Sequence, residues 1–347
     1  MVSPEVLPDR RVMVRLYAPQ AQDVRVSLDG GINLTKGDNG VWEATLGPLD
    51  PGAYRYSFTV DGASVTDPRN IEMERMQVVT RSILYVPGDR FMDTRPVPHG
   101  AVAVVNYYSN VLKKFRRFHI YTPPGYEANQ RKYPVLYLLH GANESDDSWS
   151  TVGRGNLILD NLIADGGAVP MIVVMPNGHI DQTPPNLGRG AAPGTPSPVR
   201  SEFAAFPNEF VSDIMPYVES HYRTIPDRPH RAIAGLSMGG AQTLNIAFAN
   251  LDWFSAIGIF SSGILGGNVA DWEKSHLAAL DDPKLKKGLK MIWFSTGSKD
   301  ALITVSKASV EMLNRHGFAA TFQESPGAHT WVNWRNYLYE VAPQLFR

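Results

Sequence analysis

The chain has 347 residues, 43% of them hydrophobic and 19% charged, which is enough material for two globular domains with a large core. A net charge of −1 gives no electrostatic footprint for nucleic acid or an anionic membrane, and no apolar run approaches the ~20 residues that a membrane span needs. Cysteine is absent, which excludes disulfides, thiolate catalysis and cysteine-based zinc sites.

The first part of the chain has the pattern of a β-structure. Between residues 11 and 86, apolar and polar side chains alternate in short segments, the period of half-buried strands. Turn signals such as Asp50-Pro-Gly52 and Asp61-Gly62 separate these segments. The spacing predicts a small all-β, immunoglobulin-like sandwich.

Several motifs in this region resemble the early-set, isoamylase N-terminal type of carbohydrate-binding-like domain. They are Leu16-Tyr-Ala-Pro19, Gly40-Val-Trp42, Pro48-Leu-Asp-Pro-Gly52, Tyr54-Arg-Tyr-Ser-Phe58, Val60-Asp-Gly62 and Asp67-Pro68. The resemblance implies a first domain over residues 1–90. Sugar platforms are built from exposed aromatics, but this region has one tryptophan, Trp42, and it lies on an alternating strand. We therefore expect this domain to pack against the second domain rather than to bind glycan.

The rest of the chain has the pattern of an α/β domain. Proline and glycine without a hydrophobic period predict a linker at residues 91–104, followed by a catalytic domain over 105–347. Continuous apolar runs typical of strands buried on both faces alternate with helix-like segments. The runs are 133–139, 171–175 and 290–295, and the helix-like segments include 156–164 and 204–222. This alternation predicts helices flanking a mostly parallel central sheet.

One long stretch, residues 180–201, breaks this alternation. It holds five prolines and has no hydrophobic period. A loop of this length in a compact domain is typically functional or disordered. Because it follows a central strand near the expected nucleophile, we interpret it as part of a cleft wall, the alternative being a surface loop.

The motif that carries the chemistry is Gly-x-Ser-x-Gly at Gly235, Ser237 and Gly239. A short apolar run precedes it, and the helix-forming segment 241–250 follows it. A strand, a tight turn and a helix are the setting in which this motif forms a nucleophile elbow. The serine then has a strained backbone, and side chains at the two glycines would collide with neighbouring segments.

A serine nucleophile needs a base within hydrogen-bond reach and a group that orients this base. After Ser237 the candidate bases are His276, His316 and His329. His276 lies in a polar stretch typical of a solvated helix, and His316 ends a helix, where a cation is an ordinary capping feature. His329 lies in a Gly/Pro loop directly after a strand-like segment, which favours it as the base.

Asp300 is the favoured acid, because it comes directly after the buried run 290–295, at the carboxyl end of a strand. Its alternative role is to cap the following helix. Asp281 and Asp282 lie in a polar, lysine-rich connection without a preceding buried strand.

The tetrahedral oxyanion needs two backbone N–H donors. Met238, directly after the nucleophile, supplies the first candidate. The loop after residues 133–139 reads His140-Gly-Ala-Asn-Glu144, so the Ala142 amide is the second candidate. His140 precedes the nucleophile in a loop that already has a role, which favours a structural function for it.

The second domain resembles the esterase-D-type hydrolases, and more narrowly the bacterial feruloyl and acetyl-xylan esterases. The matching motifs are Tyr137-Leu-Leu-His-Gly141, Asp147-Ser-Trp149, Met175-Pro-Asn-Gly178, Ala234-Gly-Leu-Ser-Met-Gly-Gly240, Gly297-Ser-Lys-Asp300 and His329-Thr-Trp-Val-Asn-Trp-Arg335. The resemblance implies an α/β-hydrolase fold and a Ser-His-Asp triad that falls on Ser237, His329 and Asp300. Other activities occur on the same fold, so these motifs do not determine the acyl group.

We therefore expect a serine esterase without cofactor or metal that releases ferulate from feruloylated xylan. An acetyl-xylan esterase or a general carboxylesterase is the enzyme alternative, and a glycan-binding protein with an inactive hydrolase domain is the non-enzyme one. An aryl acyl group needs an apolar slot, for which Trp149, Leu236 and Trp331 are candidate linings, although Trp331 can equally belong to the core. The chain begins without a visible signal peptide. We still expect a secreted or periplasmic protein whose leader is absent from this chain, with the cytoplasm as the alternative and the oligomeric state left open.

Overall fold

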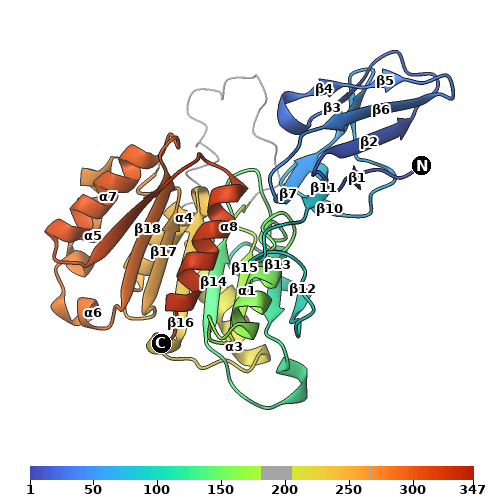
Figure 1. Ribbon diagram of the computed structural model, residues 1–347. Helices are drawn as coiled ribbons and strands as arrows, with labels where there is room; N and C mark the ends of the chain where they lie inside the picture. The colour runs from blue at the N-terminus through green and yellow to red at the C-terminus, as the bar shows by residue number, and fades with distance from the viewer. Residues whose placement is uncertain (181–204, 266–267) are drawn as a thin grey trace.

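The computed structural model describes residues 1–180, 205–265 and 268–347. Figure 1 shows a small N-terminal part built from strands, drawn in blue, beside a larger part in which helices surround one sheet. This arrangement confirms the predicted fold class, an α/β-hydrolase fold preceded by a small all-β sandwich. None of the helices in the described ranges has the length and apolar content that crossing a membrane requires.

The N-terminal part consists of three small sheets with the strand orders β1-β2-β6-β5, β4-β3-β8-β9 and β10-β11-β7. Alternate side chains, among them Val14 and Tyr56, fill one core between them, as the period-two pattern predicts. Trp42 belongs to this core, and its indole N–H donates to the Ala18 carbonyl at 2.9 Å. The elements are β1 (Glu5–Val6), β2 (Val12–Tyr17), β3 (Val24–Val26), η1 (Leu28–Gly30), β4 (Ile32–Asn33), β5 (Thr35–Lys36), β6 (Val41–Leu46), β7 (Gly52–Tyr56), β8 (Phe58–Val60), β9 (Ala63–Val65), β10 (Met73–Arg75) and β11 (Thr80–Val86).

The structure differs from the predicted linker, residues 91–104, at its carboxyl end. Strand β12 (Ala101–Ser109) begins inside that range and pairs antiparallel with β13 (Lys114–Thr122) along its whole length. The last proline of the stretch is Pro98, so the residues after it can donate to a sheet. Residues 87–100 contain neither a strand nor a helix.

The larger part is built on a sheet with the strand order β12-β13-β15-β14-β16-β17-β18-β19. The pairings from β15 to β19 are all parallel, whereas β12 and β13 are antiparallel to their neighbours. Every residue of β14 and β15 is buried, as the continuous apolar runs predict, and β17, which was not predicted from the sequence, is equally buried. The parallel strands are β14 (Val135–Leu139), β15 (Ile172–Pro176), β16 (Arg231–Leu236), β17 (Ala256–Phe260), β18 (Met291–Gly297) and β19 (Ala320–Ser325).

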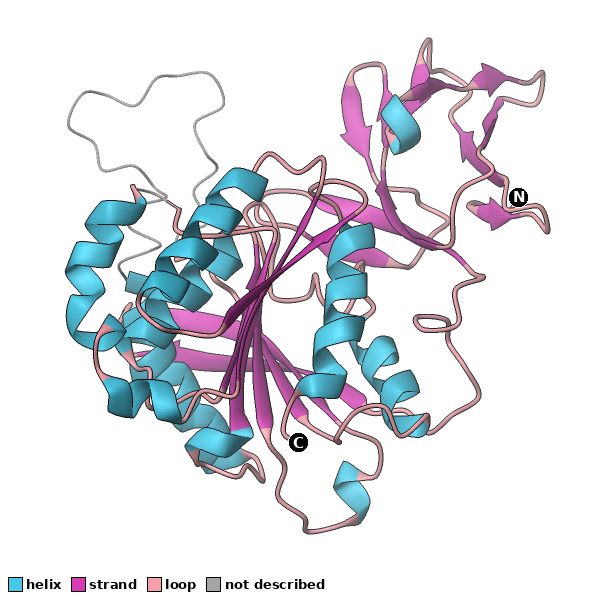
Figure 2. Ribbon diagram, turned by 60° about the vertical axis from the view of Figure 1, so that its left-hand side comes forward, coloured by secondary structure: helices cyan, strands magenta, loops and turns pink. Residues whose placement is uncertain are grey.

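Helices cover both faces of this sheet, each packed on its own apolar cluster (Figure 2). One face carries α1 (Gly155–Ala164) and α8 (Trp331–Val341), and the other carries α3 (Met215–His221), α4 (Met238–Ala249), α5 (Val269–Leu280) and α7 (Ile303–Arg315). The shorter elements are η2 (Tyr126–Ala128), the π-helical turn η3 (Phe210–Ile214), η4 (Arg228–His230), α6 (Pro283–Lys287) and η5 (Ala342–Gln344).

A buried arginine of α8 joins the two parts of the chain. The Arg335 guanidinium donates to the carbonyl of Ala53 in β7 at 3.2 Å and to the carbonyl of Val152 at 2.8 Å. Gly52 lies against the same group, and a Cβ there would stand 2.9 Å from its Nη2 atom. A side chain at position 52 would therefore displace the guanidinium.

The parallel strands place the predicted site residues together, because their carboxyl ends meet at one edge of the sheet. The loops that follow β14, β16, β18 and β19 leave from this edge. The predicted cleft wall, residues 180–201, lies outside the described residues except for Ile180.

Candidate active site

Ser237 stands at the turn between β16, which ends at Leu236, and α4, which begins at Met238. Its backbone angles, φ 51° and ψ −119°, belong to a region that residues with a side chain rarely adopt. Two hydrogen bonds hold this conformation. The Ser237 N–H donates to the Phe260 carbonyl at 2.9 Å, and the Ser262 hydroxyl donates to the Ser237 carbonyl at 2.6 Å.

The two glycines of the motif are required by close backbone contacts. A Cβ on Gly235 would stand 2.4 Å from the Gly239 carbonyl oxygen. A Cβ on Gly239 would stand 2.3 Å from the carbonyl oxygen of His140, in the loop after β14. Because both distances are far below van der Waals contact, the turn accepts only glycine at these positions.

The structure brings Ser237, His329 and Asp300 into one hydrogen-bonded chain. The His329 Nε2 atom lies 3.0 Å from the Ser237 Oγ atom. The His329 Nδ1 atom lies 2.8 Å from the Asp300 Oδ2 atom. With the proton of the neutral imidazole on Nδ1, the ring donates to Asp300 and accepts from the serine hydroxyl. This geometry permits the proton transfer that a serine nucleophile needs.

Asp300 follows β18, and its side chain is buried. Its Oδ1 atom also accepts from the Leu302 N–H at 2.9 Å, so the capping role considered from the sequence coexists with the contact to His329. Burial acts to raise the pKa of Asp300, but hydrogen bonds from His329 and the Leu302 amide outweigh it and hold this pKa below its usual value. Asp300 is therefore ionised at neutral pH.

His329 lies in the loop after β19, just before α8. The edge of its ring packs against Trp334 of α8, with ring centroids 5.0 Å apart at 87°. Its side chain is about a third exposed (37%), so a substrate can reach it from solvent. The contact with the tryptophan restricts the plane of the imidazole.

The two predicted oxyanion donors belong to segments next to the serine. Met238 is the first residue of α4, and the N–H groups of a first helical turn have no partner within the helix. Gly141 touches the elbow, because a Cβ there would stand 3.3 Å from the Ser237 Cβ atom. Ala142 follows it and is exposed. Both amides thus belong to backbone segments that border Ser237.

The other candidates from the sequence have different partners. The His316 ring lies 2.8 Å from a carboxylate oxygen of Asp281 and 2.8 Å from one of Glu273. His276 stacks on Trp272 within α5, with centroids 3.9 Å apart. Asp282 accepts from the Lys284 N–H as the cap of α6.

The expectation that Trp149 and Leu236 line an acyl slot is corrected by their burial. Trp149 is 1% exposed and Leu236 is 0% exposed, so neither presents a surface to a substrate. The Trp149 indole donates to the Leu139 carbonyl at 3.1 Å, and its ring packs edge-on against Trp331 at 5.0 Å. Trp331 is 8% exposed and takes the core position that the sequence left open.

His140 has the structural role that the sequence favours. Its ring is buried between two backbone groups: Nδ1 lies 2.8 Å from the Gly141 carbonyl, and Nε2 accepts from the Gly178 N–H at 2.9 Å. Burial, with the neighbouring His179, lowers the pKa of His140 to about 3. The ring is therefore neutral and connects the oxyanion loop to the segment after β15.

We expect His140 to make stability depend on pH. The unfolded chain, with a pKa near 6.5, binds this proton more readily than the folded one. The histidine therefore lowers the free energy of unfolding by roughly 1.4 kcal/mol per pH unit as the pH falls from about 6.5 towards 3. A glutamine at this position cannot titrate. Between pH 7 and pH 5, the free energy of unfolding measured in urea should therefore fall by about 2 kcal/mol less in His140→Gln than in wild type. An equal fall of the free energy of unfolding in the two proteins would contradict the lowered pKa of His140.

Two residues at this edge were missed from the sequence. Ser262 supports the elbow through the Ser237 carbonyl. Glu144 is 5% exposed and accepts from the Trp331 indole at 2.9 Å. The signal for Ser262 was a Ser-Ser pair directly after the buried run 256–260, at a strand's carboxyl end. No local signal identifies Glu144, because its partner lies far away in the sequence.

Comparisons with known proteins find relatives for both parts of the chain. The family model named Esterase matches residues 109–345, and the model for carbohydrate-binding module 48 (isoamylase N-terminal domain) matches residues 2–74. An endo-1,4-beta-xylanase/feruloyl esterase of Xylanibacter ruminicola is 33% identical over 96% of this chain. The chain spans 44% of that relative's length, which is less than half.

Two solved structures have the same fold. A ferulic acid esterase of Anaeromyces mucronatus, in complex with ferulic acid, is 26% identical with a TM-score of 0.62, over 75% of this chain and 96% of that one. The enterobactin esterase of Shigella flexneri covers 97% of this chain and 93% of its own with a TM-score of 0.64. At 17% identity this second likeness shows the fold alone, but it extends over both parts of the chain.

Proposed function

The chain belongs to the Esterase family, and from this premise we propose that it is a serine esterase that releases ferulate from feruloylated arabinoxylan. The observation that carries the proposal is the hydrogen-bonded chain from Ser237 through His329 to Asp300, at 3.0 and 2.8 Å. In this proposal Ser237 is the nucleophile, His329 is the general base and Asp300 orients the base.

The reaction follows from this chain of contacts. The Ser237 Oγ atom attacks the ester carbonyl carbon while the His329 Nε2 atom takes the hydroxyl proton. The N–H groups of Met238 and Ala142 donate to the oxyanion of the tetrahedral intermediate. The ester C–O bond then breaks, and His329 gives the proton to the departing sugar oxygen, which leaves as a hydroxyl. His329 then takes a proton from a water molecule as it attacks the acyl-enzyme carbonyl. The bond between the acyl group and Ser237 breaks, His329 returns the proton to the Ser237 oxygen, and the acid is released.

Asp300 acts through the imidazole. Its carboxylate accepts from the Nδ1–H group, which leaves the lone pair of Nε2 facing Ser237. When His329 takes the proton, the ring becomes a cation beside an ionised, buried carboxylate. The low pKa of Asp300 supports this role, because the group keeps its negative charge in the working pH range.

The substrate class rests on the relatives. The Xylanibacter relative is named for xylanase and feruloyl esterase activities, and the Anaeromyces structure holds ferulic acid. We propose that this chain acts on the same acyl group, ferulate. Since arabinoxylan lies outside the cell, we also propose that the protein is exported.

We propose that the chain is divided into a first domain over residues 1–90 and a catalytic domain that begins with β12 at Ala101. The match of the carbohydrate-binding module to residues 2–74 supports the first boundary. The antiparallel pairing of β12 with β13 supports the second. Trp42, the tryptophan of the first domain, is buried, which favours a packing role over a sugar platform for this residue.

The test is the acid released from feruloylated, acetylated arabinoxylan. We expect ferulate in excess of acetate, hydrolysis of methyl ferulate as well as 4-nitrophenyl acetate, and no release by Ser237→Ala. Acetate without ferulate would replace the proposal by an acetyl-xylan esterase. Turnover of small esters alone would indicate a general carboxylesterase, and binding without turnover a glycan-binding protein.

A further inference from the structure

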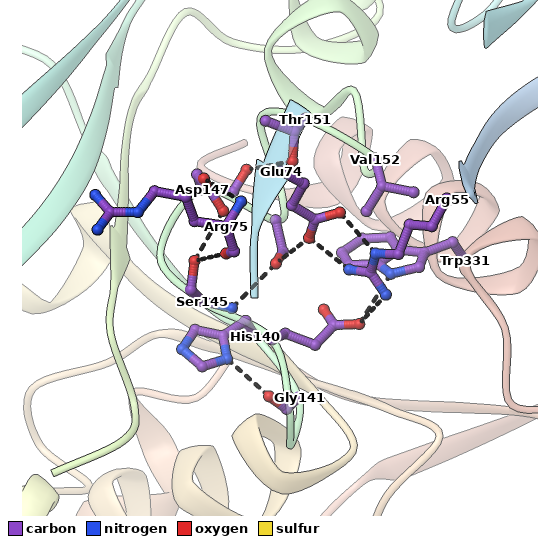
Figure 3. Close-up of polar contacts among 12 residues, drawn as sticks. Arg55, Glu74, Arg75, His140, Gly141, Ser145, Asp147, Thr151, Val152 and Trp331 are labelled. Atoms are coloured by element: carbon purple, nitrogen blue, oxygen red, sulfur yellow. Dashed lines mark hydrogen bonds and ion pairs between the residues drawn. The ribbon is translucent and has the colours of Figure 1, made fainter. Parts of the chain in front are cut away.

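The oxyanion loop is held from outside by the N-terminal domain. Figure 3 shows Arg55 and Glu74, from strands β7 and β10, directed at the segment that follows Gly141 and at Trp331. These contacts join residues that lie far apart in the sequence. They are shielded from solvent, because Glu74 is 0% and Glu144 is 5% exposed.

Arg55 is the cation shared by these two carboxylates. Its Nε and Nη2 atoms donate to Glu74 at 2.6 and 2.5 Å, and its Nη1 atom donates to the Glu144 Oε1 atom at 3.0 Å. Burial raises the pKa of Glu144 to about 7 and also raises that of Glu74, while Arg55 opposes both shifts. Without the guanidinium, two carboxylates would stand buried and without a cation, a state that proteins avoid by protonation or by rearrangement.

Further hydrogen bonds join the same loop to residues 75 and 77 of the first domain. The Gln77 N–H donates to the Asn143 carbonyl at 3.1 Å, one residue after the Ala142 amide. Asn143 has a positive φ of 63°, so the loop turns sharply at this point. Further along, the Ser145 hydroxyl donates to the Arg75 carbonyl, and the Arg75 N–H donates to Asp147 at 3.2 Å.

Glu144 also reaches the histidine side of the site. Its Oε1 atom accepts from the Trp331 indole at 2.9 Å, and the Arg55 guanidinium carbon lies 5.6 Å from the centre of the Trp331 ring. Trp331 follows His329 by two residues and packs against Trp334, which contacts the His329 ring. One arginine of the first domain thus supports both the oxyanion loop and the segment that carries the base.

We propose that Arg55 is a positioning residue of the esterase, which acts through Glu144 to hold the loop that presents the Ala142 amide. The first domain is then part of the catalytic machinery rather than an appended binding module. This inference rests on the proposed function, which assigns the Ala142 amide to the oxyanion. An oxyanion donor stabilises the transition state only at the correct distance, so a displaced loop lowers kcat more than it changes KM.

The test compares Arg55→Met with Arg15→Met. Arg15 lies within the first domain, donates to Glu5 at 2.7 Å and has a side-chain exposure of 21%, close to the 20% of Arg55. With 4-nitrophenyl acetate, which reports esterase chemistry whatever the natural acyl group, Arg55→Met should lower kcat by about 10- to 100-fold and change KM less than about threefold. The affinity for an arylboronic acid, which forms a tetrahedral serine adduct, should fall in parallel. Arg15→Met should keep both values.

A second pair of variants decides the case if Arg55→Met fails to fold. Glu144→Ala removes the contact to the loop but leaves the Arg55–Glu74 pair, and should lose kcat to a similar extent. Glu144→Gln, whose amide oxygen can still accept from Arg55 and Trp331, should recover most of that loss. Folded Glu144→Ala with wild-type kcat, or with a raised KM alone, would overturn the inference. Activity that survives Ser237→Ala would instead overturn the proposed function.

Discussion

Replacing Ser237 by alanine is expected to lower kcat by about 10⁴- to 10⁶-fold and to leave the melting temperature nearly unchanged. The serine Oγ atom is the proposed nucleophile, and without it the enzyme cannot form the acyl intermediate. The structural loss is small, because the Oγ contact that the structure shows is the one to His329 at 3.0 Å. Alanine and serine also bear the same strain at a φ of 51°.

The measurement is kcat on methyl ferulate and on 4-nitrophenyl acetate, beside thermal unfolding. Ser275→Ala is a matched control, because Ser275 lies on α5 and donates to the Trp272 carbonyl of its own helix. It should keep its activity within about twofold, as exposed helical substitutions usually do. More than a few per cent of wild-type activity in Ser237→Ala would place the nucleophile elsewhere.

The second large effect concerns the acid. Asp300→Asn should lower kcat by around 10⁴-fold, the loss that this change causes in a serine protease. An asparagine can present its N–H group to the Nδ1 atom of His329, which then favours the tautomer that carries its proton on Nε2. That proton would face Ser237 and prevent the ring from acting as a base. The imidazolium that forms later would also lack its counter-charge.

Stability separates this role from capping. The Leu302 N–H donates to the Asp300 Oδ1 atom, and an asparagine oxygen can accept the same bond. We therefore expect a melting temperature within a few degrees of wild type together with the large loss of kcat. Asp281→Asn is the control, since Asp281 pairs with His316 and should tolerate the change. Wild-type kinetics in Asp300→Asn would leave capping as its function.

The sequence predicted those features that depend on local order. Continuous apolar runs predicted the buried strands β14 and β15, and the spacing around Ser237 predicted a strand, a turn and a helix. The residues before Asp300 and His329 predicted that both follow strands, and parallel strands then bring them to one edge.

The failures concern contacts between distant segments. Trp149 lies in a polar loop, where exposure is the natural expectation. Its burial depends on Trp331 and Phe260, which approach it from other strands and helices. The partners of Glu144 are equally remote, because Arg55 precedes it by 89 residues and Trp331 follows it by 187. A pattern in one stretch cannot indicate which distant stretch will cover it.

The contact between Arg335 and β7 has a consequence for synthesis of the chain. Ala53 is translated 282 residues before Arg335, whose guanidinium donates to the Ala53 carbonyl. The first domain can therefore fold as it emerges, while the surface around Gly52 stays without this partner until Arg335 has been translated. This contact between the two domains therefore forms only after α8 has been made.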